Sequence, residues 1–113
     1  MRKTYEQMAR CQCDTANTLA VIGGKWKILI LFHLLEKDRR FNELTRLLSG
    51  ITAHTLSKDL KELAEDELIE KVIFGTIPPK TLYKLSPKGR ELEAVLLGIK
   101  QFGHKYPIPL NDD

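Results

Sequence analysis

The feature that most constrains the fold of this chain is a β-rich stretch, IEKVIFGTIPPKTLYKLS, at residues 69–86. Its β-branched and aromatic residues are interrupted by GTIPP, which predicts a hairpin with strands near residues 69–74 and 81–85. The loop falls at Gly75–Lys80, where two prolines stiffen the chain and remove backbone donors. Apart from this hairpin, the chain is expected to form short helices with tight joints.

Two short amphipathic helices are predicted immediately before the hairpin. FNELTRLLSG, at residues 41–50, has apolar residues at helical spacing and ends in a glycine that suits a helix terminus. Thr52 can cap the next helix, whose Leu56, Leu60 and Leu63 share one inner face. Two short helices with a glycine-containing turn, followed directly by a hairpin, indicate a winged helix-turn-helix.

Further helices are predicted on either side of this motif. Asp14 can cap a helix that ends at Gly23–Gly24, and KWKILILFHLLEK at residues 25–37 is apolar nearly all round, which is typical of a buried helix. Ser86 can cap a last helix, which starts with Pro87 and carries an apolar stripe. The stripe comprises Leu92, Val95, Leu96, Ile99, Phe102 and Tyr106. The predicted fold class is therefore mainly α with a small β-hairpin wing.

The length of 113 residues suits a single domain with a modest core. Residues 1–12 are polar and are expected to form a flexible segment, residues 13–106 the winged domain, and residues 107–113 a tail. A dimer that buries more surface is a reasonable expectation for so small a core. The stripe of the last helix offers an interface, although a helix that packs on its own domain shows the same stripe.

Neither the composition nor the motifs point to an enzyme or to a membrane protein. The longest apolar run, at residues 28–32 and their neighbours, is far shorter than the roughly 20 residues that span a bilayer, and the first residues lack the apolar core of a secretory signal. GGK, at residues 23–25, lacks the spacing of a phosphate-binding loop, and the three histidines lie on three different segments. We expect a cytoplasmic protein without catalytic activity, metal or cofactor.

Charge is distributed unevenly along the chain, although the net charge of +3 is only mildly basic. Residues 25–61 contain eight basic and four acidic residues, residues 62–70 five acidic and no basic residues, and residues 71–90 five basic and no acidic residues. A recognition helix contacts bases mainly with its N-terminal residues, where the helix dipole also favours phosphate. We therefore expect the first half of the second motif helix to face double-stranded DNA and its acidic end to point away.

Specific side chains can be assigned to this DNA contact. Lys58 suits a guanine edge in the major groove, and Lys61, one turn further on, suits a phosphate. Arg40 before the first motif helix and Lys80 at the hairpin loop are expected to make positioning contacts. The full predicted set is Arg40, Thr52, His54, Thr55, Ser57, Lys58, Lys61 and Lys80. The alternatives are a solvated helix face and a winged helix that contacts another protein without binding DNA.

The chain resembles the HxlR-type regulators, a group of bacterial and archaeal winged-helix transcription factors. The matching segments are CDTANTLAVIGGKWKILIL (13–31), RFNELTRLLSGIT (40–52), TLSKDLKELAEDELIEK (55–71), PPKTLYKLSPKGREL (78–92) and the closing helix. GGKW, RFNEL and the PP…Y.L…G pattern occur in the order and at the spacings of this group. Together these signals are specific, whereas any one of them alone is weak.

This resemblance implies a homodimer, formed by the terminal helices, that represses or activates nearby genes. Two recognition helices would then lie about 34–36 Å apart, which favours a palindromic operator. Two positions depart from the family pattern. Glu67 stands where a glycine is usual, and Lys80 where arginine is common, which keeps the charge but loses the bidentate fork. No polar cluster in the sequence marks a site for a small-molecule effector.

Cys13 matches a cysteine that is frequent in this family and that senses oxidants or electrophiles in some members. Asp14, which replaces the usual proline, would raise the thiol pKa, whereas a helix N-terminus at this point would lower it. A small, partly buried thiol without a sensing role is the alternative. A second alternative is a redox-active or metal-binding protein that uses Cys11 and Cys13, although two more metal ligands are not obvious nearby.

Overall fold

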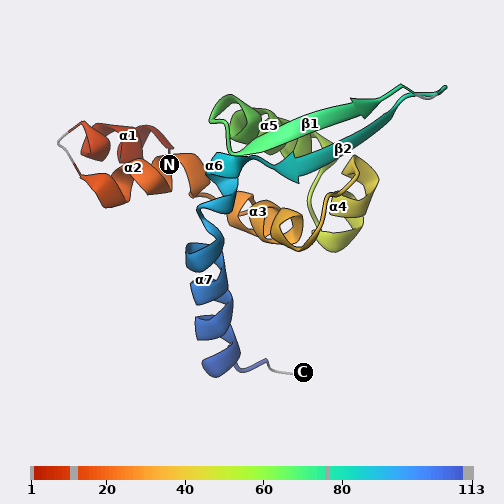
Figure 1. Cartoon of the computed structure of the whole chain (residues 1–113). Helices are drawn as coiled ribbons and strands as arrows, with labels where there is room; N and C mark the ends of the chain where they lie inside the picture. Colours follow the sequence, from red (N-terminus) through yellow and green to blue (C-terminus); the bar gives the residue numbers. More distant parts are fainter. Residues whose placement is uncertain (1, 11–12, 76, 111–113) are drawn as a thin grey trace.

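The computed structural model describes residues 2–10, 13–75 and 77–110, and it consists mainly of helices with one two-stranded antiparallel sheet (Figure 1). In chain order the elements are α1 (Arg2–Ala9), α2 (Asp14–Ile22), α3 (Lys27–Glu36), α4 (Phe41–Leu47), α5 (Ala53–Glu65), β1 (Ile69–Phe74), β2 (Lys80–Leu85), α6 (Pro87–Arg90) and α7 (Glu93–Lys105). This order confirms the predicted fold class, a mainly α winged helix-turn-helix with a small hairpin wing.

The core forms around α3, whose Ile30, Leu31 and Leu34 have no exposed surface. Helices α5 and α7 and strand β2 contact α3, in agreement with the prediction of a helix buried on most sides. The surrounding elements contribute the buried side chains Leu44, Leu56, Leu60, Leu63, Leu85 and Leu96. Burial of such a side chain stabilises the fold by roughly 1.5–3 kcal/mol, so these contacts hold the wing and the motif helices in a fixed relation.

The joint between α4 and α5 is a tight turn through Gly50. Its φ of 92° lies in the left-handed region, which glycine adopts without steric penalty. Helix α4 ends at Leu47, before the predicted limit at Gly50. Thr52 is confirmed as the N-cap of α5, because its hydroxyl oxygen accepts a hydrogen bond from the backbone N–H of Thr55 at 3.1 Å. The cap fixes where the exposed first turn of α5 begins.

The C-terminal end of α5 closes with a left-handed residue, as glycine at this position in the family suggests. Glu67 has a φ of 62°. The backbone N–H of Leu68 donates to the carbonyl of Leu63, and the N–H of Glu67 donates to the carbonyl of Ala64, both at 3.0 Å. These two bonds make a Schellman motif, which normally places glycine at the left-handed position. Glu67 keeps this conformation at a cost of roughly 1 kcal/mol relative to glycine.

The wing pairs β1 with β2 along their whole length, which confirms the predicted hairpin, and β2 begins at Lys80, one residue earlier than expected. The segment before α4 joins the hairpin through its backbone. The N–H of Arg39 donates to the carbonyl of Tyr83 at 3.0 Å, and the carbonyl of Arg39 accepts from the N–H of Tyr83 at 2.8 Å. The start of α4 is therefore fixed relative to the wing.

The last helix is divided into α6 and α7, a division that the apolar stripe does not predict. Ser86 is confirmed as the N-cap of α6, because its Oγ accepts from the backbone N–H of Gly89 at 2.9 Å. A Cβ atom at Gly89 would lie 2.1 Å from the carbonyl oxygen of Leu68, so glycine is required for this close approach. After the break, α7 projects away from the body of the domain (Figure 1).

The N-terminal region corrects two expectations. Residues 2–9 form α1, which packs on α2, rather than a flexible segment, and Arg2 donates to Glu6 of the same helix and to Asp66 after α5. Residues 1, 11 and 12 of the predicted flexible segment lie outside the described residues. Cys13, not Asp14, occupies the N-cap position of α2, since its backbone is extended and Asp14 is already helical. The Cys13 side chain makes no capping hydrogen bond.

Among the described residues, no single helix has both the length and the apolar character needed to cross a membrane. Helices α2 and α3 reach that length and composition only as a pair, with a bend of 78° between them.

Candidate nucleic-acid interface

The first half of α5 presents a polar and basic face to solvent. His54, Ser57, Lys58 and Lys61 are exposed, whereas the leucines of the same helix are buried against the core. Neither lysine forms an ion pair within the described part of the chain. Two ammonium groups, an imidazole and a hydroxyl therefore remain available to an external partner on this side of the helix.

Thr52 and Thr55, also among the predicted DNA contacts, are engaged with each other. The Thr52 hydroxyl accepts from the backbone N–H of Thr55 and donates to the Thr55 hydroxyl oxygen at 3.0 Å. The donor hydrogen of Thr52 is thus used inside the protein, and Thr55 is half-buried. These two threonines shape the start of α5, while His54, Ser57, Lys58 and Lys61 offer polar groups to an external partner.

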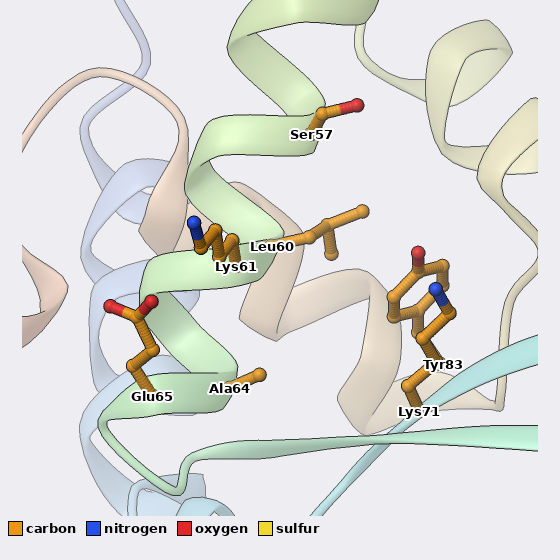
Figure 2. A pocket seen from close by; sticks show the side chains of 7 residues that line it. All are labelled: Ser57, Leu60, Lys61, Ala64, Glu65, Lys71 and Tyr83. Carbon is orange, nitrogen blue, oxygen red and sulfur yellow. The ribbon is translucent and has the colours of Figure 1, made fainter.

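A groove of about 530 Å³ separates α5 from the hairpin (Figure 2). Ser57, Lys61 and Glu65 border it on the helix side, and Lys71 and Tyr83 border it on the strand side. Leu60 and Ala64 also line it. Figure 2 shows the Ser57, Leu60 and Ala64 side chains directed from the helix toward the side on which the two strand residues lie. The groove lies between α5 and the hairpin and is lined by residues of both.

Arg40 and Lys80, the predicted positioning residues, border the same hollow of about 480 Å³ at the wing tip. The remaining lining residues are Ile77, Pro78, Pro79 and Thr81. Both charged side chains are exposed. The carboxylate of Glu43 accepts from the backbone N–H of Arg40 at 3.2 Å and so fixes the start of α4. The structure therefore brings these two cations together, in a hollow lined by none of the residues that line the groove beside α5.

The acidic second half of α5 is bound inside the protein, a detail that the sequence does not indicate. The Nζ atom of Lys27, a nearly buried lysine of α3, donates to Glu62 at 2.5 Å. The guanidinium of Arg2 in α1 donates twice to the Asp66 carboxylate, at 2.9 and 3.0 Å. These pairs anchor the end of α5 to two other helices and neutralise part of its negative charge.

The same contacts set the protonation of the carboxylates. The hydrogen bond from Lys27 lowers the pKa of Glu62 below its usual value of 4.5, against the opposing effect of burial. Burial raises the pKa of Asp59, one turn earlier, against the opposing attraction of Lys27. Asp59 is half-buried and is the one acidic residue between Ala53 and Lys61 of α5.

Two residues of this surface, Lys71 and Tyr83, were not predicted as contacts. They pair directly across β1 and β2, so their side chains lie on the same face of the hairpin. Alternation along the strands could have placed both on one face, but the sequence does not show which face turns toward α5. That choice depends on the packing of the hairpin against the core.

The predicted interface residues of the last helix divide into two groups. Val95, Ile99, Phe102 and Tyr106 are exposed, with exposed fractions of 44–69%. Leu96 is 1% exposed and belongs to the core of its own domain, and Leu92 packs against that core. The first group forms an apolar face on the projecting helix, whereas Leu96 anchors α7 to α3. The expectation that all six form one interface is thus corrected for Leu96.

The redox candidate Cys13 is an exposed free thiol at the start of α2. It is therefore not the partly buried thiol of the alternative reading. Cys11, its neighbour, lies outside the described residues. Among the described histidine, cysteine, aspartate and glutamate residues, no group of three is arranged to hold a metal ion.

Two motif helices joined by a tight turn, with an exposed second helix beside a hairpin, define a winged helix-turn-helix protein. A family model for HxlR-like helix-turn-helix proteins matches residues 21–110. The chain belongs to this HxlR-like family and is a transcriptional regulator of the helix-turn-helix type.

Individual relatives agree with this assignment. YdeP of Bacillus subtilis (strain 168), described as an uncharacterized HTH-type transcriptional regulator, is 43% identical over 94 residues, which cover 83% of this chain and 73% of YdeP. The redox regulator HypR in its oxidized form superposes with a TM-score of 0.83 and 36% identity, over 86% of this chain and all of the other. Diamide-treated YodB from B. subtilis superposes with a TM-score of 0.69 and 28% identity, over 86% and 98%.

Proposed function

We propose that this protein binds a palindromic DNA operator as a homodimer and regulates transcription there. The observation that carries the proposal is the exposed, unpaired polar face of α5 formed by His54, Ser57, Lys58 and Lys61. An α-helix fits the major groove, and lysine, serine and histidine side chains can reach base edges or phosphates from its N-terminal half. The internal pairing of the acidic half removes negative charge that would repel the duplex.

In this proposal the side chains of α5 have separate tasks. Lys58 contacts a guanine edge, whereas Lys61 contacts a phosphate one turn further on. His54 and Ser57 lie beside them and complete the contact face. Thr52 and Thr55 hold the first turn in place, and Arg40 and Lys80 bind the backbone at the wing. The wing thereby orients the recognition helix in the groove.

The apolar face of α7 is the proposed dimer interface. Val95, Ile99, Phe102 and Tyr106 are exposed on a helix that projects from the domain (Figure 1). Exposed apolar patches on this scale are typical of interaction surfaces. A two-fold dimer would place two copies of α5 about 34–36 Å apart, so that each reads one half-site of a palindrome.

The test is binding of the purified protein to labelled DNA from its own upstream region, at low and at physiological salt. We expect a shifted complex whose molar mass corresponds to two chains on one duplex. Replacing Phe102 by serine should produce monomers and weaken operator binding without altering α5. If no DNA is bound at low salt, the winged helix serves protein contact instead, and the proposal fails.

We propose in addition that Cys13 makes DNA binding responsive to oxidants. Its thiol is exposed at the N-terminal end of α2, and two structural relatives are the redox regulator HypR and diamide-treated YodB. Diamide should change operator affinity in the wild type and leave Cys13→Ser unaffected. Equal affinity of the oxidised and reduced wild-type protein would exclude sensing through Cys13.

A further inference from the structure

The groove between α5 and the hairpin contains polar groups that no other described side chain binds. Within the described residues, the Lys61 and Lys71 ammonium groups and the Ser57 and Tyr83 hydroxyls have no side-chain partner. Figure 2 shows the Ser57 side chain directed toward the side of Lys71 and Tyr83, whereas the Lys61 and Glu65 side chains extend to the other side of the helix. Three donors, those of Ser57, Lys71 and Tyr83, thus face the groove. This donor set suits a singly charged anion with several oxygen atoms, and a backbone phosphate of a nucleic acid has that chemistry.

The residues on the strand side of the groove are held in position by the protein itself. Lys71 and Tyr83 are directly opposite each other in the β1–β2 register, which places their Cβ atoms about 5 Å apart on one face. The backbone of Tyr83 is also held by two hydrogen bonds to Arg39, at 2.8 and 3.0 Å. The same bridge positions Arg40 at the neighbouring hollow. The groove therefore keeps a constant relation to both the wing and the start of α4.

The position of the groove indicates which anion occupies it. If the first half of α5 lies in the major groove, as the proposed function requires, the DNA strand that borders the major groove passes between α5 and the wing. The groove lies between these two elements (Figure 2). Its apolar floor of Leu60 and Ala64 offers no competing donor or acceptor, so the contacts come from its polar rim.

We propose that this groove binds one backbone phosphate of the operator, held by Lys71 and Tyr83 from the wing and by Ser57 from α5. The proposal rests on the proposed function and adds two residues to its DNA contacts. Lys71 and Tyr83 are positioning residues: they fix the register of α5 in the major groove and read no base. Their loss should therefore weaken binding to every DNA sequence by a similar factor.

The first test compares two lysines of the same hairpin. Lys71→Ala should weaken binding about three- to tenfold on operator and random DNA alike, and should reduce the slope of log affinity against log salt by about one. Lys84→Ala is the matched control, because Lys84 lies one residue from Tyr83 on β2 and its side chain is directed to the opposite face. Lys71→Arg should restore most of the affinity, and Tyr83→Phe should cause a smaller loss than Lys71→Ala.

The second test locates the phosphate. Operator duplexes that each carry one neutral methylphosphonate locate the contact. At one position per half-site, the methylphosphonate should weaken the DNA binding of the wild type but cause no further loss of binding in Lys71→Ala. Equal losses of DNA affinity in Lys71→Ala and Lys84→Ala would overturn the proposed phosphate site. So would losses of affinity that add fully when Lys71→Ala is combined with each methylphosphonate. Neither result would contradict DNA binding itself. Absence of DNA binding by the wild type would overturn the proposed function and the phosphate site together.

Discussion

Arg2 and Asp66 are 64 residues apart in the chain, yet the Arg2 guanidinium donates two hydrogen bonds to the Asp66 carboxylate. Asp66 is the C-cap of α5, and Arg2 is the first residue of α1. The contact therefore ties the N-terminal helix to the end of the proposed recognition helix. Arg2 also donates to Glu6 of its own helix at 3.0 Å, which fixes the direction of its side chain.

The Arg2–Asp66 contact should contribute measurably to stability because it is bidentate and partly buried. In a double-mutant cycle of Arg2→Ala and Asp66→Ala, we expect a coupling free energy of about 1 kcal/mol, at the upper end for pairs near a surface. Urea unfolding at low salt provides the measurement. Lys3→Ala, which removes a neighbouring exposed cation of α1, should leave the free energy of unfolding nearly unchanged. A coupling free energy near zero would show that the Arg2–Asp66 pair does not stabilise the packing of α1 on the domain.

The Lys27–Glu62 pair should respond differently, because Lys27 is 5% exposed. Glu62→Gln leaves a nearly buried cation without its carboxylate, and we expect a loss of about 1–3 kcal/mol. Lys27→Met combined with Glu62→Gln should recover most of this loss, because no unpaired charge then remains. The free energies of unfolding of Glu62→Gln and of the double variant, compared with the wild type, test both expectations. A double variant that is less stable than Glu62→Gln would contradict the interpretation.

The same pair predicts a pH dependence. The pKa of Glu62 is lowered in the folded protein, so its contribution to stability is fully present above about pH 4.5 and is lost as the pH falls through the lowered value. The difference in unfolding free energy between wild type and Glu62→Gln should therefore shrink as the pH falls below 4.5. Asp59 acts in the opposite sense, because burial raises its pKa, and Glu62→Gln removes the further rise that the Glu62 charge causes. A difference that does not vary with pH would refute this assignment.

Glu67 offers a stabilising substitution. Glycine has no Cβ penalty at a φ of 62°, so Glu67→Gly should stabilise the protein by about 1 kcal/mol and raise Tm by about 4 °C. The hydrogen bonds of the residue are retained, since they use only its backbone atoms, including the carbonyl that accepts from Ser86 Oγ at 2.6 Å. Glu67→Ala is the control, because it removes the carboxylate but keeps the Cβ, and it should give no comparable gain. Thermal unfolding of the three proteins measures both effects.

Local sequence rules predicted much of this fold. Thr52 and Ser86 cap their helices as expected, because a cap depends on residues two or three positions away. The hairpin and the order of the motif also follow from local patterns. The break between α6 and α7 does not, since it depends on the close approach of Gly89 to the Leu68 carbonyl, about 20 residues earlier.

The candidate site was predicted in part for the same reason. The exposed face of α5 follows from helical periodicity, which predicts the exposure of His54, Ser57, Lys58 and Lys61. The partners of Glu62 and Asp66 lie in α3 and α1, and Lys71 faces α5 only because of how the hairpin packs. These relations join distant segments, which a local pattern does not encode. The helix at residues 2–9 was missed because its packing on α2 and the hydrogen bonds from Arg2 to Asp66 exist only in the folded chain.

The DNA contacts of Lys58 and Lys61 should differ in how strongly they depend on the DNA sequence. Lys58→Ala should weaken operator binding by about 1–3 kcal/mol and relax the preference at one position of each half-site, if Lys58 contacts a guanine edge. Lys61→Ala should weaken operator and random DNA equally and reduce the salt slope by about one. Titrations of both variants on operator and random duplexes measure the difference. Equal losses on the two duplexes for Lys58→Ala would assign Lys58 to a phosphate.

The central claim is that the first half of α5 reads a palindromic DNA site as part of a homodimer. Selection of binding sites from a random duplex library by the purified wild-type protein and by Lys58→Ala tests it most directly. We predict that the wild type enriches a palindrome with half-site centres about 10 base pairs apart, and that Lys58→Ala loses the preference at one symmetric pair of positions. Enrichment of no sequence by the wild type at low salt, or the same motif from both proteins, would contradict the account.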